Sequence, residues 1–262
     1  MSRERFRWLA IKEHELIFAI LPRILDQLHS NHTRYPTGKG YNGLSTLLLT
    51  SVANMNLLGI PETRTIVRGV SWEVYNRLIQ ERTGSIPRIS YDRGEMEMMT
   101  PGRLHEQLAT LVDLMIRAYT DYTGIEIASA ASTTFKRNDL AGGFEADKSY
   151  YIEHEALVRS KDEIDLTIDP PPDLILEIEI TSSAIAKMQL LAAMGIPEVW
   201  RYDGTSLLVY CLSGECYEER ARSLCLPNIP LQLIESMLDR RHEMGENAFV
   251  REFRRLLVAG VA

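Results

Sequence analysis

Residues 171–181 read Pro-Pro-Asp-Leu-Ile-Leu-Glu-Ile-Glu-Ile-Thr, a segment in which acidic and aliphatic side chains alternate. Successive side chains of a β-strand point to opposite faces, so the two kinds of side chain separate. The aliphatic face consists of Leu174, Leu176, Ile178 and Ile180. The other face consists of Asp173, Ile175, Glu177 and Glu179. The segment therefore predicts a strand that covers a core with one face and gathers carboxylates on the other.

The two glutamates of this strand would lie roughly 7 Å apart. Two carboxylates that close repel each other, and the pKa of at least one rises unless a cation compensates. A hard divalent ion with oxygen ligands is one solution. The structural alternative is a half-exposed strand whose polar face lies in water.

The segment after the strand contains a lysine that favours a site. Lys187 is the one charged residue between residues 180 and 197. At helical spacing it shares the apolar arc with Leu190, Leu191 and Met194. An inward lysine beside an acidic strand is a candidate partner for its carboxylates. The alternative is a lysine at the edge of the helix that extends its ammonium group to solvent.

A third carboxylate precedes the acidic strand in the chain. Asp147 stands at the head of the aromatic segment Asp-Lys-Ser-Tyr-Tyr-Ile, residues 147–152. If this segment pairs with the acidic strand, Asp147 supplies another oxygen ligand. On its own, an aspartate in this position is more typical of a loop or turn.

The remaining pattern predicts helices and strands in mixed order. Helices are expected at residues 71–82 with Ser71 as N-cap, at 104–122, at 184–194, and from 231 onward. Strands are expected at residues 89–98 around a turn at 92–94, and at 126–135, 144–152, 173–181, 199–202 and 206–211. The apolar stripe of the second helix consists of Leu104, Leu108, Leu111, Met115, Tyr119 and Tyr122. This order predicts an α/β (α+β) domain with helices around one mixed sheet.

Composition excludes several classes of protein. Of the 262 residues, 45% are hydrophobic and 25% are charged, as in globular proteins and unlike disordered or fibrous ones. The formal net charge of −7 argues against a uniformly positive nucleic-acid coat, although a local basic groove is still allowed. The three cysteines lack the spacing of a zinc site, and their odd number suits a reducing cytoplasm. No segment has the pattern of a membrane span or an export signal.

Several segments between residues 70 and 255 resemble the Uma2 family of restriction endonucleases, within the PD-(D/E)xK nuclease superfamily. The segments are RISYDRGEMEMMTPGRLHEQL from residue 88, STTFKRNDL from 132, GGFEADKSYYI from 142, IDLTIDPPPDLILEIEITSS from 164, MGIPEVWRYDG from 194, and FVREFR from 249. They occur in the family's order and span most of the chain. The resemblance implies a restriction-endonuclease-like fold with a mixed central β-sheet flanked by helices.

The resemblance also implies a metal-dependent endonuclease that hydrolyses the phosphodiester bonds of DNA. Asp147 and Glu177 match the acidic residues that hold Mg²⁺ or Mn²⁺ in that superfamily, and Glu179 is expected to be a further ligand of the metal. Glu179 occupies the position of the superfamily's catalytic lysine. Lys187 is therefore expected to provide the ammonium group from the following helix. The missing lysine at position 179 and the acidic net charge favour an alternative: a catalytically degenerate nuclease fold acting as a binding or interaction module.

Further residues are expected near this site. His105 and Glu106 match the family's helix-start motif, and Asp173 shares the face of Glu177; these three are expected to support the metal ligands. Capping and solvation are the alternative for the first two. Candidate phosphate contacts are Lys136, Arg137, Arg240, Arg241, His242, Arg251, Arg254 and Arg255. Cutting both strands of a duplex would favour a homodimer.

The resemblance does not cover the N-terminal part of the chain. We expect residues 1–65 to form an extension and residues 66–262 to form the Uma2-like domain. The extension is either a helical appendage or an untranslated stretch, with Met55 as the true start. A peptide recovered from before Met55 by mass spectrometry would refute the late start.

Overall fold

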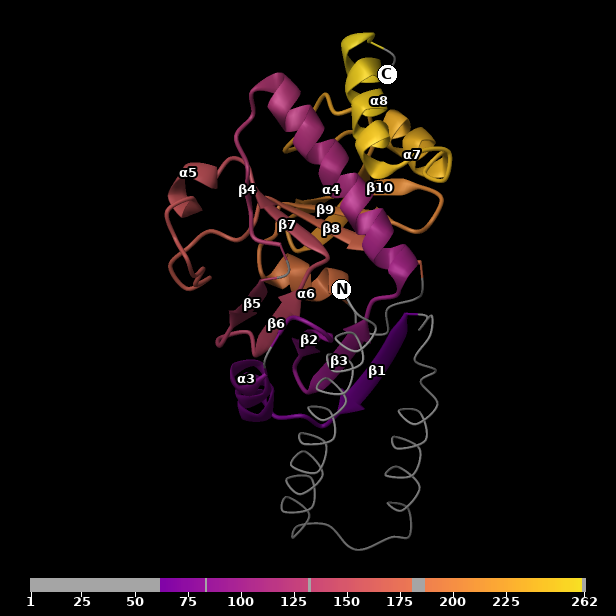
Figure 1. Cartoon of the computed structure of the whole chain (residues 1–262). Coiled ribbons are helices and arrows are strands. Elements are labelled where there is room, and N and C mark those ends of the chain that lie inside the picture. Colours follow the sequence, from indigo (N-terminus) through magenta and orange to yellow (C-terminus); the bar gives the residue numbers. More distant parts are fainter. Residues whose placement is uncertain (1–61, 83, 132, 181–186, 261–262) are drawn as a thin grey trace, which may run out of the picture.

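The computed structural model describes residues 62–82, 84–131, 133–180 and 187–260. The fold is α+β, with two sheets and the helices packed against them (Figure 1). The expected N-terminal extension falls almost wholly outside the described residues, as does the start of the helix expected at 184–194.

The first sheet has five strands in the order β1-β3-β2-β6-β5 within the described residues. Their bounds are Thr63–Arg68 for β1, Arg88–Asp92 for β2, Glu95–Thr100 for β3, Thr134–Arg137 for β5 and Gly142–Glu145 for β6. Helix α3 (Trp72–Glu81) packs on this sheet through a small core that includes Tyr75, Ile89 and Tyr91. The predicted cap is confirmed, because the side chain of Ser71 accepts a hydrogen bond from the N–H of Val74.

The second sheet has six strands in the order β11-β10-β9-β8-β7-β4 within the described residues. Their bounds are Ala128–Ser129 for β4, Lys148–Tyr151 for β7, Leu174–Ile178 for β8, Glu198–Tyr202 for β9, Leu207–Ser213 for β10 and Cys216–Arg220 for β11. Strand β8 pairs in parallel with β9 and antiparallel with β7, so the sheet is mixed as predicted. The predicted hairpin of β9 and β10 is confirmed.

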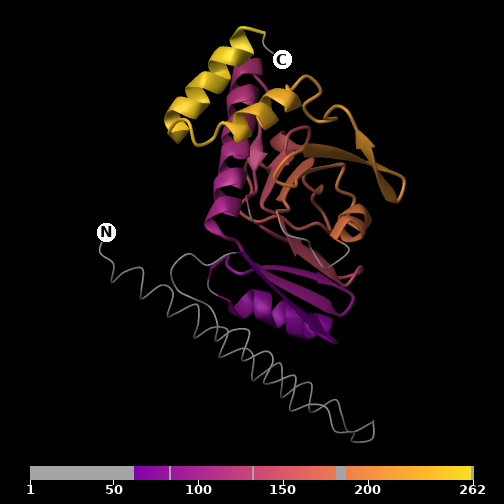
Figure 2. The same ribbon diagram turned by 90° about the vertical axis from the view of Figure 1, so that its right-hand side faces the viewer.

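Different helices cover the two faces of the second sheet (Figure 2). Helices α4 (Arg103–Thr123), α7 (Leu231–Asp239) and α8 (Glu246–Val258) lie on one face. The predicted aliphatic residues of β8, from Leu174 to Ile178 at alternate positions, pack into this core. On the other face, α6 (Lys187–Ala193) packs on Ile175 and Val199. A short helix, α5 (Glu155–Val158), lies in the connection between β7 and β8.

The structure differs from the expected single sheet at one break in the chain. The strand expected at residues 144–152 is two strands, β6 in the first sheet and β7 in the second, separated by Ala146 and Asp147. The carboxylate of Asp147, rather than a main-chain carbonyl, accepts the N–H of Ile178 on β8. The strand expected at 126–135 is likewise divided into β4 and β5. The chain therefore leaves the first sheet just before Asp147 and enters the second sheet just after it.

The apolar stripe predicted for α4 is wrong at its two ends. Leu104 and Tyr122 are 42% and 56% exposed, whereas His105 is completely buried. The helix begins one residue earlier than expected and turns its first histidine inward, toward Asp147. Polar contacts thus decide the orientation of the first turn of this helix.

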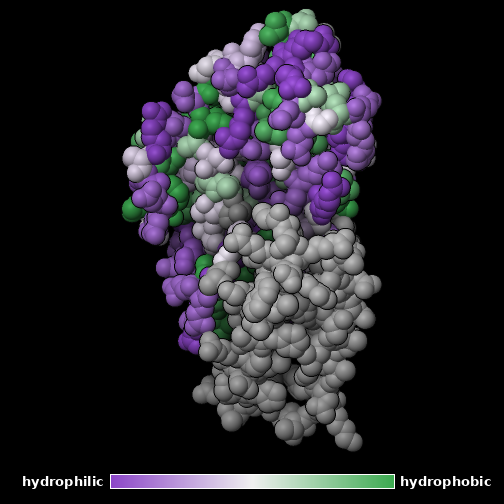
Figure 3. All heavy atoms as spheres, viewed as in Figure 1, coloured by the Kyte–Doolittle hydropathy of each residue, from purple (hydrophilic) through white to green (hydrophobic). Residues whose placement is uncertain are grey.

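In the part of the view that shows described residues, most of the surface is hydrophilic, with hydrophobic side chains distributed among the polar ones (Figure 3). Among the described residues, no helix has the length and apolar character needed to cross a membrane.

We expect Gly143→Ala to destabilise the fold by about 1–3 kcal/mol. A Cβ atom at Gly143 would collide with the hydroxyl group of Tyr75 and lie 2.8 Å from its Cζ atom. The Tyr75 ring cannot withdraw easily, since it is buried and stacks on Tyr91 at a centroid distance of 4.8 Å. Urea unfolding measures the change. Gly245→Ala, where nothing lies within 4 Å of the added atom, is the control and should change stability by less than about 1 kcal/mol. An equal effect of both substitutions would contradict the proposed collision.

Candidate metal and active site

Strand pairing brings two of the predicted acidic residues together. Lys148 of β7 lies opposite Leu176 of β8. One step further along this antiparallel register, Asp147 comes opposite Glu177, and directly opposed residues share a face of the sheet. Both carboxylates are buried, with 2% and 5% of each residue exposed. The sequence identified both residues, but only the register shows that they meet.

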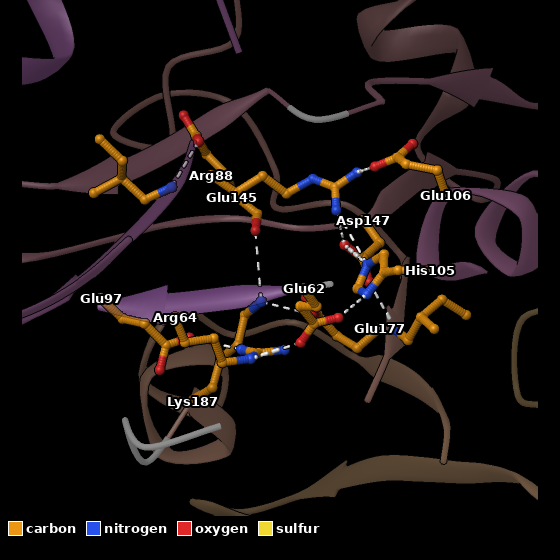
Figure 4. Close-up of polar contacts among 12 residues, drawn as sticks. Glu62, Arg64, Arg88, Glu97, His105, Glu106, Glu145, Asp147, Glu177 and Lys187 are labelled. Atoms are coloured by element: carbon orange, nitrogen blue, oxygen red, sulfur yellow. Dashed lines mark hydrogen bonds and ion pairs between the residues drawn. The ribbon is translucent and has the colours of Figure 1, made fainter. Parts of the chain in front are cut away.

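Lys187 completes this group from the first turn of α6 (Figure 4). Its Nζ atom donates a hydrogen bond of 2.6 Å to Oε2 of Glu177 and lies 3.5 Å from the main-chain oxygen of Glu145. The helix holds the lysine inward, because Leu190 and Leu191 on the same arc are packed into the core. Lys187 therefore meets the acidic strand as its place in the apolar arc suggested.

Glu177 has one carboxylate oxygen without a partner. Its Oε1 atom is buried and makes no hydrogen bond to any described residue. Burial, together with the negative charges of Asp147 and Glu179, raises the pKa of Glu177 to about 7 against the attraction of Lys187. An unpartnered anionic oxygen in a buried position is costly. The arrangement is suited to a carboxylate that receives a cation.

Asp147, in contrast, has a hydrogen-bond donor on each carboxylate oxygen. Its Oδ2 atom accepts the N–H of Ile178 at 2.7 Å. Its Oδ1 atom accepts from the guanidinium group of Arg88 and from Nε2 of His105, the latter at 2.9 Å. Burial on its own would raise the pKa of Asp147, but His105, Arg88 and Lys187 lower it to about 2. Asp147 is therefore an anion in the folded protein, held by cations on one oxygen.

His105 links Asp147 to a second carboxylate. Its Nδ1 atom lies 2.6 Å from Oε2 of Glu62, while Nε2 faces Asp147. A doubly protonated ring would donate to both carboxylates, and Nε2 also lies 3.2 Å from Nη1 of Arg88. Burial opposes this charge, but the two carboxylates raise the pKa of His105 overall. His105 was expected near the site from its helix-start position, whereas nothing in the sequence pointed to Glu62.

Arg88, at the start of β2, is a site residue that the sequence did not reveal. One nitrogen of its guanidinium group donates to Asp147, and the other donates to Oε1 of Glu106 at 2.7 Å. The Arg88 side chain is 9% exposed and that of Glu106 is 44% exposed. Glu106 therefore contacts the site through Arg88 and does not reach Asp147 itself. An arginine within a strand segment gives no local signal of this contact.

The structure does not bring Glu179 or Asp173 into contact with the group formed by Asp147, Glu177 and Lys187. Glu179 forms an ion pair with Arg201 of β9. Asp173 lies at the opposite end of β8, where it accepts the N–H groups of Ile152 and His154. These contacts occupy Glu179 with a cation and give Asp173 a role in fastening the loop after β7.

Most of the candidate phosphate contacts are already engaged by neighbouring groups. Among those with polar partners are Arg137 with Asp139, Lys136 with Asn76, Arg240 with Glu243, Arg254 with Asp121 and Arg255 with Glu252. Arg254 and Arg255 belong to α8, which lies far from the first sheet (Figure 1). The proposal of a basic DNA groove therefore gains no support from these residues.

Asp147 and Glu177 offer carboxylate oxygens to a divalent cation. Within the described ranges, no group of three or more His, Cys, Asp or Glu side chains is placed to hold a metal ion. The two carboxylates of Asp147 and Glu177 share a face of the sheet, and Oε1 of Glu177 is unpartnered. Hard cations prefer such oxygen atoms and fill their remaining positions with water. The residues present fit a cation held by two carboxylates rather than by three.

The raised pKa of Glu177 predicts a stability difference that depends on pH. Burial raises its pKa from 4.5 to about 7. Between these values the folded protein holds a proton that the unfolded chain has released, so stability falls as pH rises. Metal-free wild type should therefore lose stability relative to Glu177→Gln between pH 5 and 7, by at most about 1.4 kcal/mol per pH unit. Urea unfolding with a chelator at both pH values measures this, and parallel pH profiles would contradict it.

A family model and a solved structure are similar to this chain. None of the curated proteins matches this chain in sequence. Among solved structures, a crystal structure described as "a putative nuclease belonging to DUF820" from Anabaena variabilis is 14% identical, with a TM-score of 0.43. That similarity covers 70% of this chain and 99% of the other. The model of the Uma2 family, described as "putative restriction endonuclease", matches residues 72–235, which is more than half of the sequence. The chain therefore belongs to the Uma2 family.

Proposed function

We propose that this protein is a metal-dependent endonuclease that hydrolyses phosphodiester bonds of DNA. The observation that carries the proposal is the position of Lys187, whose Nζ atom donates to Glu177 beside Asp147 while Oε1 of Glu177 has no partner among the described residues. An acidic pair with an adjacent ammonium group is suited to hydrolysis of an anionic ester. The lysine reaches the acidic strand from α6, although position 179 is a glutamate.

Asp147 and Glu177 would hold Mg²⁺ or Mn²⁺ in this function. The bound cation supplies Lewis acidity, which lowers the pKa of a water molecule and neutralises charge on the phosphate. Lys187 orients the attacking water or stabilises the added negative charge on the phosphorus centre. The N–H of Ile178 and the imidazole ring of His105 hold the Asp147 carboxylate in place. Glu179 contributes through its charge and its pair with Arg201.

The proposal extends to the setting in which the enzyme acts. We propose double-stranded DNA as substrate, a homodimer when both strands are cut, and the cytoplasm as compartment. The family description supports the nucleic-acid substrate. The three cysteines are free, which is compatible with a reducing compartment.

Nicking of supercoiled plasmid DNA tests the proposal directly. Wild-type protein should nick the plasmid with Mg²⁺ or Mn²⁺ and stop when a chelator is added. Asp147→Asn, purified in parallel, is the control for a contaminating nuclease. Its nicking should fall by about a hundredfold or more, since a metal-binding carboxylate is lost. Equal nicking by both proteins would refute the assignment of the site.

A second function is favoured by a specific observation. Every oxygen of Asp147 already has a partner, and Glu179 is paired with Arg201. A nuclease fold with such a satisfied site could act as a binding or interaction module. Tight Mn²⁺ binding in calorimetry without DNA cleavage that depends on Glu177 would favour this function over the enzyme.

A further inference from the structure

The cationic partners of Asp147 occupy one of the two carboxylate oxygens that a metal ion could use. Oδ2 of Asp147 is committed to the N–H of Ile178, a contact that joins β7 to β8. Oδ1 accepts from both Arg88 and His105. A carbonyl-type oxygen has two lone pairs, so Oδ1 is saturated. Oδ2, with one donor, keeps a free lone pair, so a divalent cation can bind both oxygens of Asp147 only if one of the two donors withdraws from Oδ1.

His105 is the less mobile of the two donors. It is completely buried, it belongs to the first turn of the long helix α4, and its other ring nitrogen is held by Glu62. Moving the ring would break both ion pairs and expose two buried carboxylates. His105 is thus expected to stay on Asp147.

Arg88 has a second partner on the solvent side. Its Nη2 atom already contacts Glu106, whose side chain is 44% exposed, whereas Asp147 is 1% exposed (Figure 4). A guanidinium group can pair with one carboxylate through two parallel hydrogen bonds. Arg88 can therefore leave Asp147 by pairing fully with Glu106, without losing its counter-ion.

We infer that Arg88 is a competitor for the metal position: it neutralises Asp147 in the metal-free protein and moves onto Glu106 when a divalent cation binds. This inference rests on the proposed function, because it concerns the metal of that site. Arg88 acts through Asp147 and is a positioning residue. The same contact stabilises the metal-free fold and lowers the affinity for metal, since the cation must replace an existing ion pair.

Calorimetric titration with Mn²⁺ alone tests the inference without DNA. Arg88→Met removes the competitor and should tighten Mn²⁺ binding by about tenfold or more, because a neighbouring cation shifts the equilibria of a carboxylate by at least this factor. Glu106→Gln removes the second position of Arg88 and should weaken Mn²⁺ binding by about threefold. Unchanged or weaker binding by Arg88→Met would overturn the inference.

A double-substitution cycle separates movement of Arg88 from a simple effect of charge. If Arg88 moves onto Glu106, the effect of Glu106→Gln should disappear in the Arg88→Met protein. Independent charges would instead give additive effects, and additivity would overturn the inference. Circular dichroism confirms that each variant is folded. If Arg88→Met does not fold, Glu106→Gln alone still tests the inference, because Glu106 is half-exposed and its substitution should leave the fold intact. An unchanged Mn²⁺ affinity of Glu106→Gln would contradict the movement of Arg88 onto Glu106.

Failure of the inference and failure of the proposed function give different results. Wild type that cleaves DNA with Mn²⁺, together with Arg88→Met that binds Mn²⁺ more weakly, would refute the inference and leave the enzyme. Wild type that does not cleave, together with tighter Mn²⁺ binding by Arg88→Met, would refute the enzyme and support the inference.

Discussion

Glu177→Gln is expected to lower the rate of plasmid nicking by about a thousandfold, whereas Glu179→Gln should change it by less than about threefold. The two glutamates are separated by one residue, but their surroundings differ. Glu177 has a buried oxygen without a partner in the described residues and shares its face with Asp147. Glu179 is held by Arg201. The single unpartnered oxygen therefore identifies Glu177 as the carboxylate that receives the cation.

The same pair of variants contains its own control for folding. Glutamine at position 177 still accepts a hydrogen bond from Lys187 and removes a carboxylate whose pKa burial has raised to about 7. Glu177→Gln should thus be at least as stable as the wild type at pH 7. Lost nicking in a more stable protein would show that the carboxylate is needed for the reaction. If Glu179→Gln were as inactive as Glu177→Gln, Glu179 would be a metal ligand, as first expected from the sequence.

The two local patterns of the sequence were sufficient to predict the orientation of Glu177 and Lys187. A strand alternates its side chains with a period of two, so the aliphatic residues of 174–178 had to oppose Glu177. Helical spacing placed Lys187 with Leu190 and Leu191, and the structure shows all three on the inward arc. Such patterns are set by the local backbone alone.

Contacts between distant segments could not be predicted in the same way. Asp147 meets Glu177 only because of the register of β7 and β8, and no residue in either strand indicates that register. Glu62 and Arg88 reach His105 and Asp147 from the first sheet. The division into two sheets also depends on such pairing, because the chain passes from β6 to β7 without a turn signal at Ala146. Residues that the first sheet and the segment just before it contribute to the site are therefore the part that sequence periodicity misses.

Lys187→Met is expected to lower plasmid nicking by about a hundredfold to a thousandfold. Methionine has a similar length and fits the apolar arc that Leu190 and Leu191 form on α6, so packing should be kept. What is lost is the ammonium group 2.6 Å from Oε2 of Glu177. Lys148→Met is the matched control: Lys148 lies opposite Leu176, on the other face of the sheet from Glu177, and its removal should change nicking by less than about threefold.

Lys187 also acts on the charge of Glu177, and this effect has to be separated from a direct role in the reaction. The ammonium group opposes the burial that raises the pKa of Glu177, so Lys187→Met should raise that pKa further. Its Mn²⁺ affinity should then be weaker than that of the wild type near pH 7 and recover as the pH rises. Nicking measured at a higher pH with saturating Mn²⁺ removes this contribution. A defect that persists there assigns Lys187 to the water or the phosphate, whereas full recovery would show that its only role is to keep Glu177 ionised.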